Sequence, residues 1–378
     1  KFLDGPSTQT VSIQVDDGDA ANNLSNTAST DVDVANVAPT VAFSNPATTA
    51  NEGDTVVFNF DITDPGQDTF TVAASSCGAQ ATVQGSSITG NTGTLTCKFL
   101  DGPSTQTVSI QVDDGDATNN LSNTASTDVS VSNVAPIVTL TGDNSAQEGE
   151  AKTYDFTVSD PGDDTFTGSA NCGAGGSLVA SSFTVTGNSG TATGSFRCFF
   201  PDGPATTTVQ AAFTDSDGAT STNGAMPVAV ANVPPAATFG APAVVDEGSP
   251  IVLSLTNVLD PSPVDTGVGF KYAFDCGDGL GYGPWGGINT VSCPTVDNGT
   301  RTVKGKVQDK DGGYMEYTAG VTINNVAPVI TSVTATPNVL AVNTLTTVVA
   351  NFTDAGTGDT HTCSFSWDDK VPPTENAG

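Results

Sequence analysis

The chain of 378 residues carries 41 acidic side chains against 10 Lys and Arg, which gives a formal net charge of −31. This charge would repel phosphate backbones and anionic membrane surfaces, so it argues against nucleic acid and lipid headgroups as partners. No apolar run approaches the roughly 18 to 20 residues of a membrane-spanning helix, so we expect no membrane insertion in this segment.

A motif of Asn, Val, Ala or Pro, and Pro recurs at Asn36, Asn133, Asn232 and Asn325, with spacings of 97, 99 and 93 residues. Self-similarity at a nearly fixed period indicates a tandem array. Because proline cannot continue a strand ladder, we interpret each motif as a linker. The expected segments are a C-terminal half repeat (1–39), three whole repeats (40–136, 137–235 and 236–328) and an N-terminal half repeat (329–378).

The first segment nearly repeats the second half of the next one. Residues 1–39 and 98–136 are identical except at three positions, which points to a recent duplication within a longer array. We therefore expect the displayed chain to be part of a longer protein. The three differences are Ala21 and Thr118, Asp33 and Ser130, and Ala35 and Ser132.

Strand patterns follow in each repeat. In "TVVFNFDIT", Phe58, Phe60 and Ile62 alternate with polar residues, and "TVSIQVDD" alternates in the same way. This period of two predicts half-buried strands. About seven such strands fit into each unit, which indicates an all-β fold of tandem immunoglobulin-like Greek-key sandwiches, arranged as beads on a string.

Three stretches carry a family resemblance. "GPSTQTVSIQVDDGDA" (102–117), "FKYAFDCGDG" (270–279) and "GTRTVKGKVQDKDGG" (299–313) resemble segments of PKD-type domains, and the third whole repeat is the most similar. The linkers resemble those of cadherins, because Glu, Asp and a linker Asn occur together at the junction between repeats. The resemblance implies tandem extracellular modules, as in bacterial or archaeal adhesins and fibres, surface layers or secreted enzymes.

Six of the seven cysteines occur two to a whole repeat, at equivalent places. One disulfide in each repeat is the simplest pairing, and it implies an oxidising, extracytoplasmic compartment. Metal binding is the alternative, but there is no CxxC, and the single histidine, His361, cannot supply ligands to three sites. The expected pairs are Cys77 with Cys97, Cys172 with Cys198, and Cys276 with Cys293.

Acidic residues recur in four turns of each whole repeat. In a sandwich with strands A, B, C, E, F and G, successive loops alternate between the two ends. The A–B and E–F loops of one repeat therefore face the B–C and F–G loops of the next across the linker Asn. We expect carboxylates of neighbouring repeats to converge on each linker.

Such a set offers six to eight hard oxygen ligands at flexible spacing, which favours calcium over magnesium or zinc. The alternative is that Asp, Asn and Gly simply favour turns, although Glu is a poor turn residue. The expected ligands are Asp4, Asn36, Asp64, Asp68, Asp113 and Asp116 at the first linker; Glu52, Asp101, Asn133, Asp160, Asp164, Asp215 and Asp217 at the second; Glu148, Asp202, Asn232, Asp260, Asp265, Asp309 and Asp311 at the third; and Glu247, Asp297, Asn325 and Asp354 at the fourth.

No set of residues predicts an enzyme. A Ser-His-Asp or Cys-His site would need His361, which we interpret as a strand residue. Trp285, Tyr282 and Tyr272 could form a sugar-stacking patch, but core and loop packing is the interpretation that we prefer.

The sequence thus predicts a structural or adhesive segment of a long extracellular or cell-surface fibre. Its expected partners are other copies of the chain, or glycans and proteins of the cell surface or matrix. Two alternatives remain open: a stalk or carbohydrate-binding accessory of a secreted hydrolase, and a noncovalent filament joined by complementary half repeats.

Overall fold

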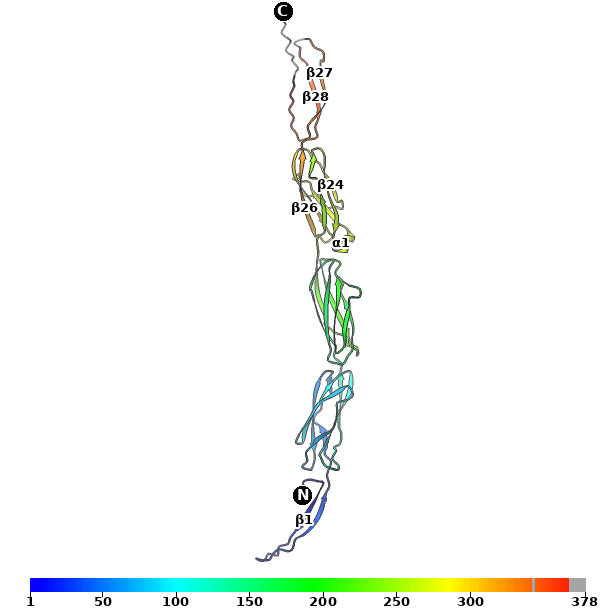
Figure 1. The fold of residues 1–378 in the computed structure, drawn as a ribbon, viewed down its shortest axis with the longest axis vertical. Helices are drawn as coiled ribbons and strands as arrows, with labels where there is room; N and C mark the ends of the chain where they lie inside the picture. Colours follow the sequence, from blue (N-terminus) through cyan, green and yellow to red (C-terminus); the bar gives the residue numbers. More distant parts are fainter. Residues whose placement is uncertain (342–343, 367–378) are drawn as a thin grey trace, which may run out of the picture. The chain divides into compact units, whose positions relative to one another are not determined.

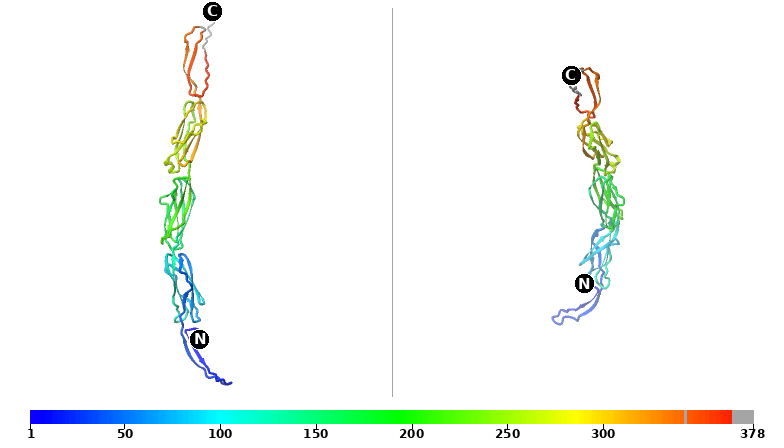
Figure 2. Two further views of the ribbon diagram at one scale, coloured as in Figure 1. Left: turned by 180° about the vertical axis from the view of Figure 1, so that it is seen from behind. Right: turned by 45° about the horizontal axis from the view of Figure 1, so that its top comes forward.

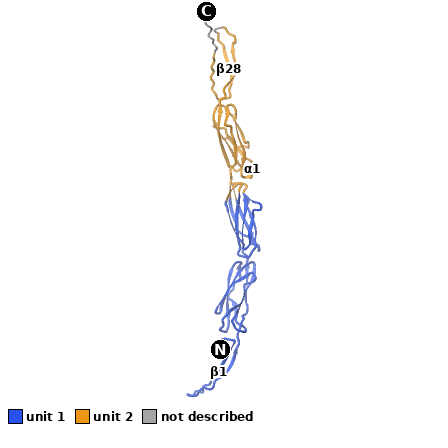
Figure 3. Ribbon diagram, in the orientation of Figure 1, with its two compact units in different colours: residues 1–144, 151–199, 207–228 blue, residues 145–150, 200–206, 229–378 orange. Residues whose placement is uncertain are grey.

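The computed structural model describes residues 1–341 and 344–366, and nearly all of its regular structure is β (Figure 1). Two compact units are distinguished (Figure 3). Unit 1 comprises residues 1–144, 151–199 and 207–228; unit 2 comprises residues 145–150, 200–206 and 229–378.

In unit 1, residues 40–136 form a sandwich of two four-stranded sheets. The predicted alternation is confirmed, because Phe58, Phe60, Val108 and Ile110 are all at most 1% exposed. β4 pairs parallel to β10, whereas the other pairs are antiparallel. The sheets are β3 (Thr40–Phe43), β5 (Thr55–Thr63), β8 (Thr92–Phe99) and β7 (Ala81–Thr89), and β4 (Thr49–Asn51), β10 (Ala125–Ser132), β9 (Ser104–Asp113) and β6 (Thr71–Ser76).

The strands of residues 137–235 follow the same order, and Figure 2 shows them in green from two further directions. Tyr154, Phe156 and Phe196 are buried in unit 1. One sheet contains β11 (Ile137–Gly142), β13 (Ala151–Ser159), β17 (Thr191–Phe199) and β15 (Ser177–Leu178), with β16 (Thr184–Ser189) paired to β17. The other contains β12 (Ser145–Gln147), β19 (Ala225–Ala231), β18 (Ala205–Thr214) and β14 (Thr167–Asn171).

In unit 2, residues 236–328 form a sandwich with one short helix, α1 (Pro263–Val268). The helix begins after Ser262, whose side chain accepts a hydrogen bond from the Asp265 N–H, and Pro263 fits the first turn. The sheets are β20 (Ala236–Gly240), β22 (Ile251–Leu259) and β24 (Thr290–Cys293), and β21 (Val244–Asp246), β26 (Tyr314–Asn324), β25 (Gly299–Gln308) and β23 (Lys271–Asp275).

Two strand pairs complete the described chain. β1 (Ser7–Ile13) pairs with β2 (Ala28–Val34) in unit 1, and β27 (Val329–Thr336) pairs with β28 (Thr347–Thr353) in unit 2. Val11 and Ile13 are 47% and 65% exposed, whereas Val108 and Ile110 at the matching positions of the next repeat are 0% exposed. The fold is thus an all-β tandem array of immunoglobulin-like sandwiches. Among the described residues, no helix has the length and apolarity needed to span a membrane.

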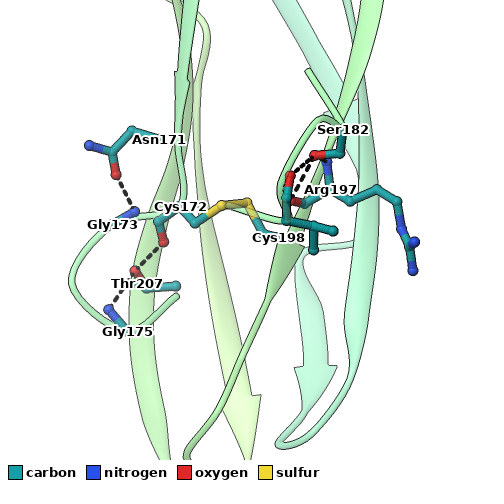
Figure 4. The surroundings of a disulfide bond; sticks show 9 residues. Asn171, Cys172, Gly173, Gly175, Ser182, Arg197, Cys198 and Thr207 are labelled. Carbon is teal, nitrogen blue, oxygen red and sulfur yellow. Dashed lines mark hydrogen bonds between the residues drawn. A yellow bond between two sulfur atoms is a disulfide. The ribbon is translucent and has the colours of Figure 1, made fainter. Parts of the chain in front are cut away.

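Three disulfides join the expected cysteine pairs: Cys77 to Cys97, Cys172 to Cys198, and Cys276 to Cys293. In each repeat the first cysteine directly follows a strand of one sheet, and the second lies in a strand of the other sheet. Figure 4 shows Cys172 and Cys198, with Thr207 donating a hydrogen bond to the Cys172 carbonyl at 2.9 Å. Each disulfide therefore connects the two sheets of its sandwich.

Candidate metal centres at the linkers

A glutamate of each whole repeat reaches the linker that follows it. The Glu52 carboxylate accepts hydrogen bonds from the Val134 N–H at 2.7 Å and from the Gly102 N–H at 2.9 Å. Glu148 accepts from Val233 and Gly203 at the same two distances. Glu247 accepts from Val326 at 2.6 Å. The glutamate thus connects the A–B turn to the linker backbone, and in the first two repeats also to the E–F turn.

Within unit 1, the Asn133 linker brings together carboxylates from two repeats. Oxygens of Glu52, Asp101 and Asp164 lie within 4.8 Å of one another, as do oxygens of Asp160, Asp164 and Asp215. Asp164 belongs to both groups. We call the residues of these two groups, together with the predicted residues Asn133 and Asp217, the Asn133 cluster.

The Asn133 cluster has buried members, and several of its oxygens have no hydrogen-bond partner. Asp164 is 0% exposed and Glu52 is 2% exposed. One oxygen each of Asp101, Asn133, Asp160 and Asp164 is buried without a hydrogen-bond partner. Because an ionised carboxylate removed from water needs a cation or donors, this arrangement favours a positive charge at its centre.

The pKa values of Glu52 and Asp217 are raised by burial and by the charges of neighbouring carboxylates. The pKa of Glu52 is raised to about 7, chiefly by burial. The charges of Asp164 and Asp160 add to this rise, and the two backbone donors oppose it. Desolvation and the charges of Asp164 and Asp101 likewise raise the pKa of Asp217. A bound cation would offset these shifts, because it favours the ionised form of each carboxylate.

Close backbone contacts hold the two repeats of unit 1 together at this linker. The Asp163 N–H donates to the Leu100 carbonyl at 3.0 Å. Gly53 has φ +78°, and a Cβ there would lie 2.5 Å from the Pro161 Cβ. Only glycine therefore fits this turn without displacement. The contacts position the carboxylates, which come from loops of two different repeats.

In unit 2, we call the residues predicted for the Asn232 linker the Asn232 cluster: Glu148, Asp202, Asn232, Asp260, Asp265, Asp309 and Asp311. Oxygens of Glu148, Asp202, Asp265 and Asp311 lie within 4.8 Å of one another. Asp265 is 0% exposed, and neither of its oxygens has a hydrogen-bond partner. Asn232 donates to Asp309 at 3.0 Å, as Asn133 donates to Asp215 at 3.1 Å.

At the Asn36 linker, the predicted ligand Asp113 lies in neither of the two acidic groups described below. The Asp113 carboxylate accepts from Gly115 and Asn120 in its own turn, whereas Asp114 accepts from Asn36 at 3.0 Å. Asp113 ends β9, so the next residue points to the opposite side of the chain. The groups here are Asp64, Asp68 and Asp114, and Asp4, Asp68 and Asp116.

The Asn325 linker of unit 2 departs from the plan. Asn325 is exposed, and His361 Nε2 lies 2.6 Å from Asp354 Oδ2. Desolvation and the neighbouring charges of Glu247, Asp354 and Asp297 raise the pKa of Asp359. Asp359 was not predicted, although "DAGTGD" places it five residues after Asp354, as "DPSPVD" places Asp265 after Asp260.

The aromatic residues of the third whole repeat enclose a lysine. Lys306 Nζ lies 4.2 Å from the Tyr282 ring centre and 4.6 Å from that of Trp285. Trp285 also contacts Tyr314 edge-on, at 6.3 Å between ring centres. This cation–π packing fits the preferred interpretation of these rings as loop packing.

No protein-family model matches the chain, and no curated protein matches it. Solved structures to which the chain is similar include an I-band fragment of titin, at 13% identity and TM-score 0.32, covering 76% of this chain and 98% of that one. An ICAM-5 ectodomain fragment has 14% identity and TM-score 0.34, covering 78% and 79%. A Drosophila N-cadherin fragment has 11% identity and TM-score 0.23, covering 69% of this chain and 90% of that one.

Proposed function

We propose that this chain is a structural and adhesive segment of an extracellular or cell-surface protein, in which calcium ions at the linkers set the angle and stiffness between repeats. In this proposal each disulfide and each sandwich core keep a repeat folded, while the linker clusters control only the junctions. The modules are PKD-like, and no catalytic role is assigned to them.

The observation that supports calcium most strongly is the buried, unpartnered oxygen of Asp164, which is 0% exposed and belongs to both groups of the Asn133 cluster. Its neighbours are carboxylate and amide oxygens, which are hard donors without nitrogen or sulfur competitors. Calcium accepts six to eight such oxygens in flexible geometry, whereas magnesium demands a stricter octahedron. The donor set of this cluster therefore fits calcium.

The free energy of calcium binding is small compared with the free energy of unfolding of a repeat. Extracellular calcium modules have dissociation constants of roughly 0.1 to 1 mM. At about 1 mM calcium, one site then stabilises the bound state by only roughly 0.4 to 1.4 kcal/mol. This is enough to favour one junction geometry and small compared with the stability of a folded domain, about 5 to 15 kcal/mol.

Small-angle scattering of the same sample in calcium and in chelator tests the mechanical role. We expect a larger spread of interdomain distances in chelator, while circular dichroism shows unchanged strand content. If the scattering curves superimposed in the two conditions, calcium would not control the stiffness of the linkers.

Protons should compete with calcium at Glu52, whose pKa in the metal-free chain is about 7. Because the folded pKa lies above the unfolded value, the metal-free folded state gains protons between about pH 4.5 and 7 and loses that stabilisation as pH rises through 7. Calcium needs the ionised form, so we expect about tenfold weaker binding at pH 6 than at pH 8. Calorimetric titration of the wild-type chain and of Glu52→Gln checks this; equal wild-type affinities at both pH values would contradict it.

A further inference from the structure

One of the linker clusters already contains a cation. In unit 2, the Lys310 ammonium lies 2.7 and 2.9 Å from the two oxygens of Asp202 and 2.5 Å from Asp311 Oδ2. It also lies 3.7 Å from Oδ1 of the fully buried Asp265. Lys310 thus contacts three of the four carboxylates that converge in the Asn232 cluster.

The matching position of the other F–G turns carries no charge. Lys310 separates Asp309 from Asp311 in "DKDG", and Ser216 separates Asp215 from Asp217 in "DSDG". The Ser216 hydroxyl donates to Asp164 at 2.6 Å within unit 1. At the Asn36 linker the position is Gly115. The carboxylates are thus retained while the residue between them changes from glycine or serine to lysine.

We propose that the Lys310 ammonium takes the place of one calcium ion in the Asn232 cluster, so that this linker binds one ion fewer than the Asn133 linker. The inference rests on the proposed calcium function and adds a difference between junctions. Residues 309–311 contribute the lysine and two of the acidic groups, so the substitution of one residue converts a metal position into a covalently attached cation.

Charge and geometry support this assignment. A calcium ion in the group of Glu148, Asp202, Asp265 and Asp311 would need oxygens that now face the ammonium. A lysine ammonium in contact with carboxylates remains protonated at neutral pH. Two cations close together would repel each other across a few ångströms. The ammonium therefore excludes an ion from the oxygens that it contacts, while Asp260 and Asp309 remain for another ion.

The test counts bound calcium on the full chain by equilibrium dialysis at saturating calcium, with bound calcium measured by atomic absorption. Lys310→Ser reproduces the residue of the Asn133 cluster and is expected to gain one ion per chain. Ser216→Lys is the reciprocal change and is expected to lose one. Lys304→Ser removes a lysine that is paired with Glu316 at 3.4 Å, far along β25 from the turn, and is expected to keep the wild-type count.

The outcomes separate the two proposals. A wild-type chain that binds calcium, with the same count in Lys310→Ser and in Ser216→Lys, would overturn the role of Lys310 and leave the calcium function in place. No calcium bound by any of the chains would overturn the calcium function itself. Circular dichroism of each variant establishes that the counts refer to folded protein.

Discussion

Replacing Asp164 with Asn is expected to weaken calcium binding at the Asn133 linker at least tenfold while both adjoining sandwiches remain folded. Asp164 is the one residue shared by the two acidic groups of that cluster, and its side chain is 0% exposed. Loss of its charge affects every ion that the cluster holds. With dissociation constants of roughly 0.1 to 1 mM in the wild type, a tenfold loss lowers the occupancy of the linker to about one half or less at about 1 mM calcium.

The measurement is calorimetric titration of the full chain with calcium, compared with a matched control. Asp128→Asn removes the same charge at an exposed strand position, where the carboxylate accepts a hydrogen bond from Thr107 at 2.7 Å. The control is expected to titrate like the wild type. If Asp164→Asn did so as well, the buried carboxylate would have no part in binding a cation.

Removing the disulfide of the first whole repeat is expected to lower the stability of that repeat substantially. Cys77 and Cys97 enclose a loop with a sequence separation of 20 residues. The loop-entropy model assigns such a crosslink about 3 kcal/mol. For a domain of this size that corresponds to a melting temperature lower by on the order of 10 to 20 °C.

The variant is Cys77→Ala with Cys97→Ala, and hydrogen exchange read by mass spectrometry localises the effect. Strands β5, β8 and β9 should exchange faster, whereas the sandwich of residues 236–328 should be unchanged. Cys363→Ser is the control, because Cys363 is an exposed free cysteine. Unchanged exchange in residues 40–136 would show that the sandwich core alone maintains the fold.

Much of the fold could be predicted because its signals are local. Alternation of Phe58, Phe60 and Ile62 with polar residues follows from the geometry of a strand with one buried face, and β5 has that burial pattern. The division of the first strand into β3 and β4 was not predicted. These short segments join different sheets, and no local pattern marks that change.

The acidic clusters were predictable in plan because turns of known order must meet at the linkers. Which residues contact one another in these clusters depends on strand register and on contacts between residues far apart in the sequence. The choice of Asp114 over Asp113 depends on which side of the chain faces Asn36 at the end of β9. The contact of Lys310 with Asp202, across 108 positions of sequence, could not be derived from spacing.

The most direct test of calcium binding at the linkers is a crystal structure of the chain grown in calcium, with anomalous scattering used to identify the ions. We expect an ion 2.3 to 2.6 Å from carboxylate oxygens of Asp164 and its neighbours, the distance range of calcium–oxygen bonds. We also expect the Lys310 ammonium in place of an ion beside Asp202. The result that would rule out calcium at the linkers is a structure without an ion at any linker, in which the buried Asp164 oxygens contact only water or protonated carboxyls.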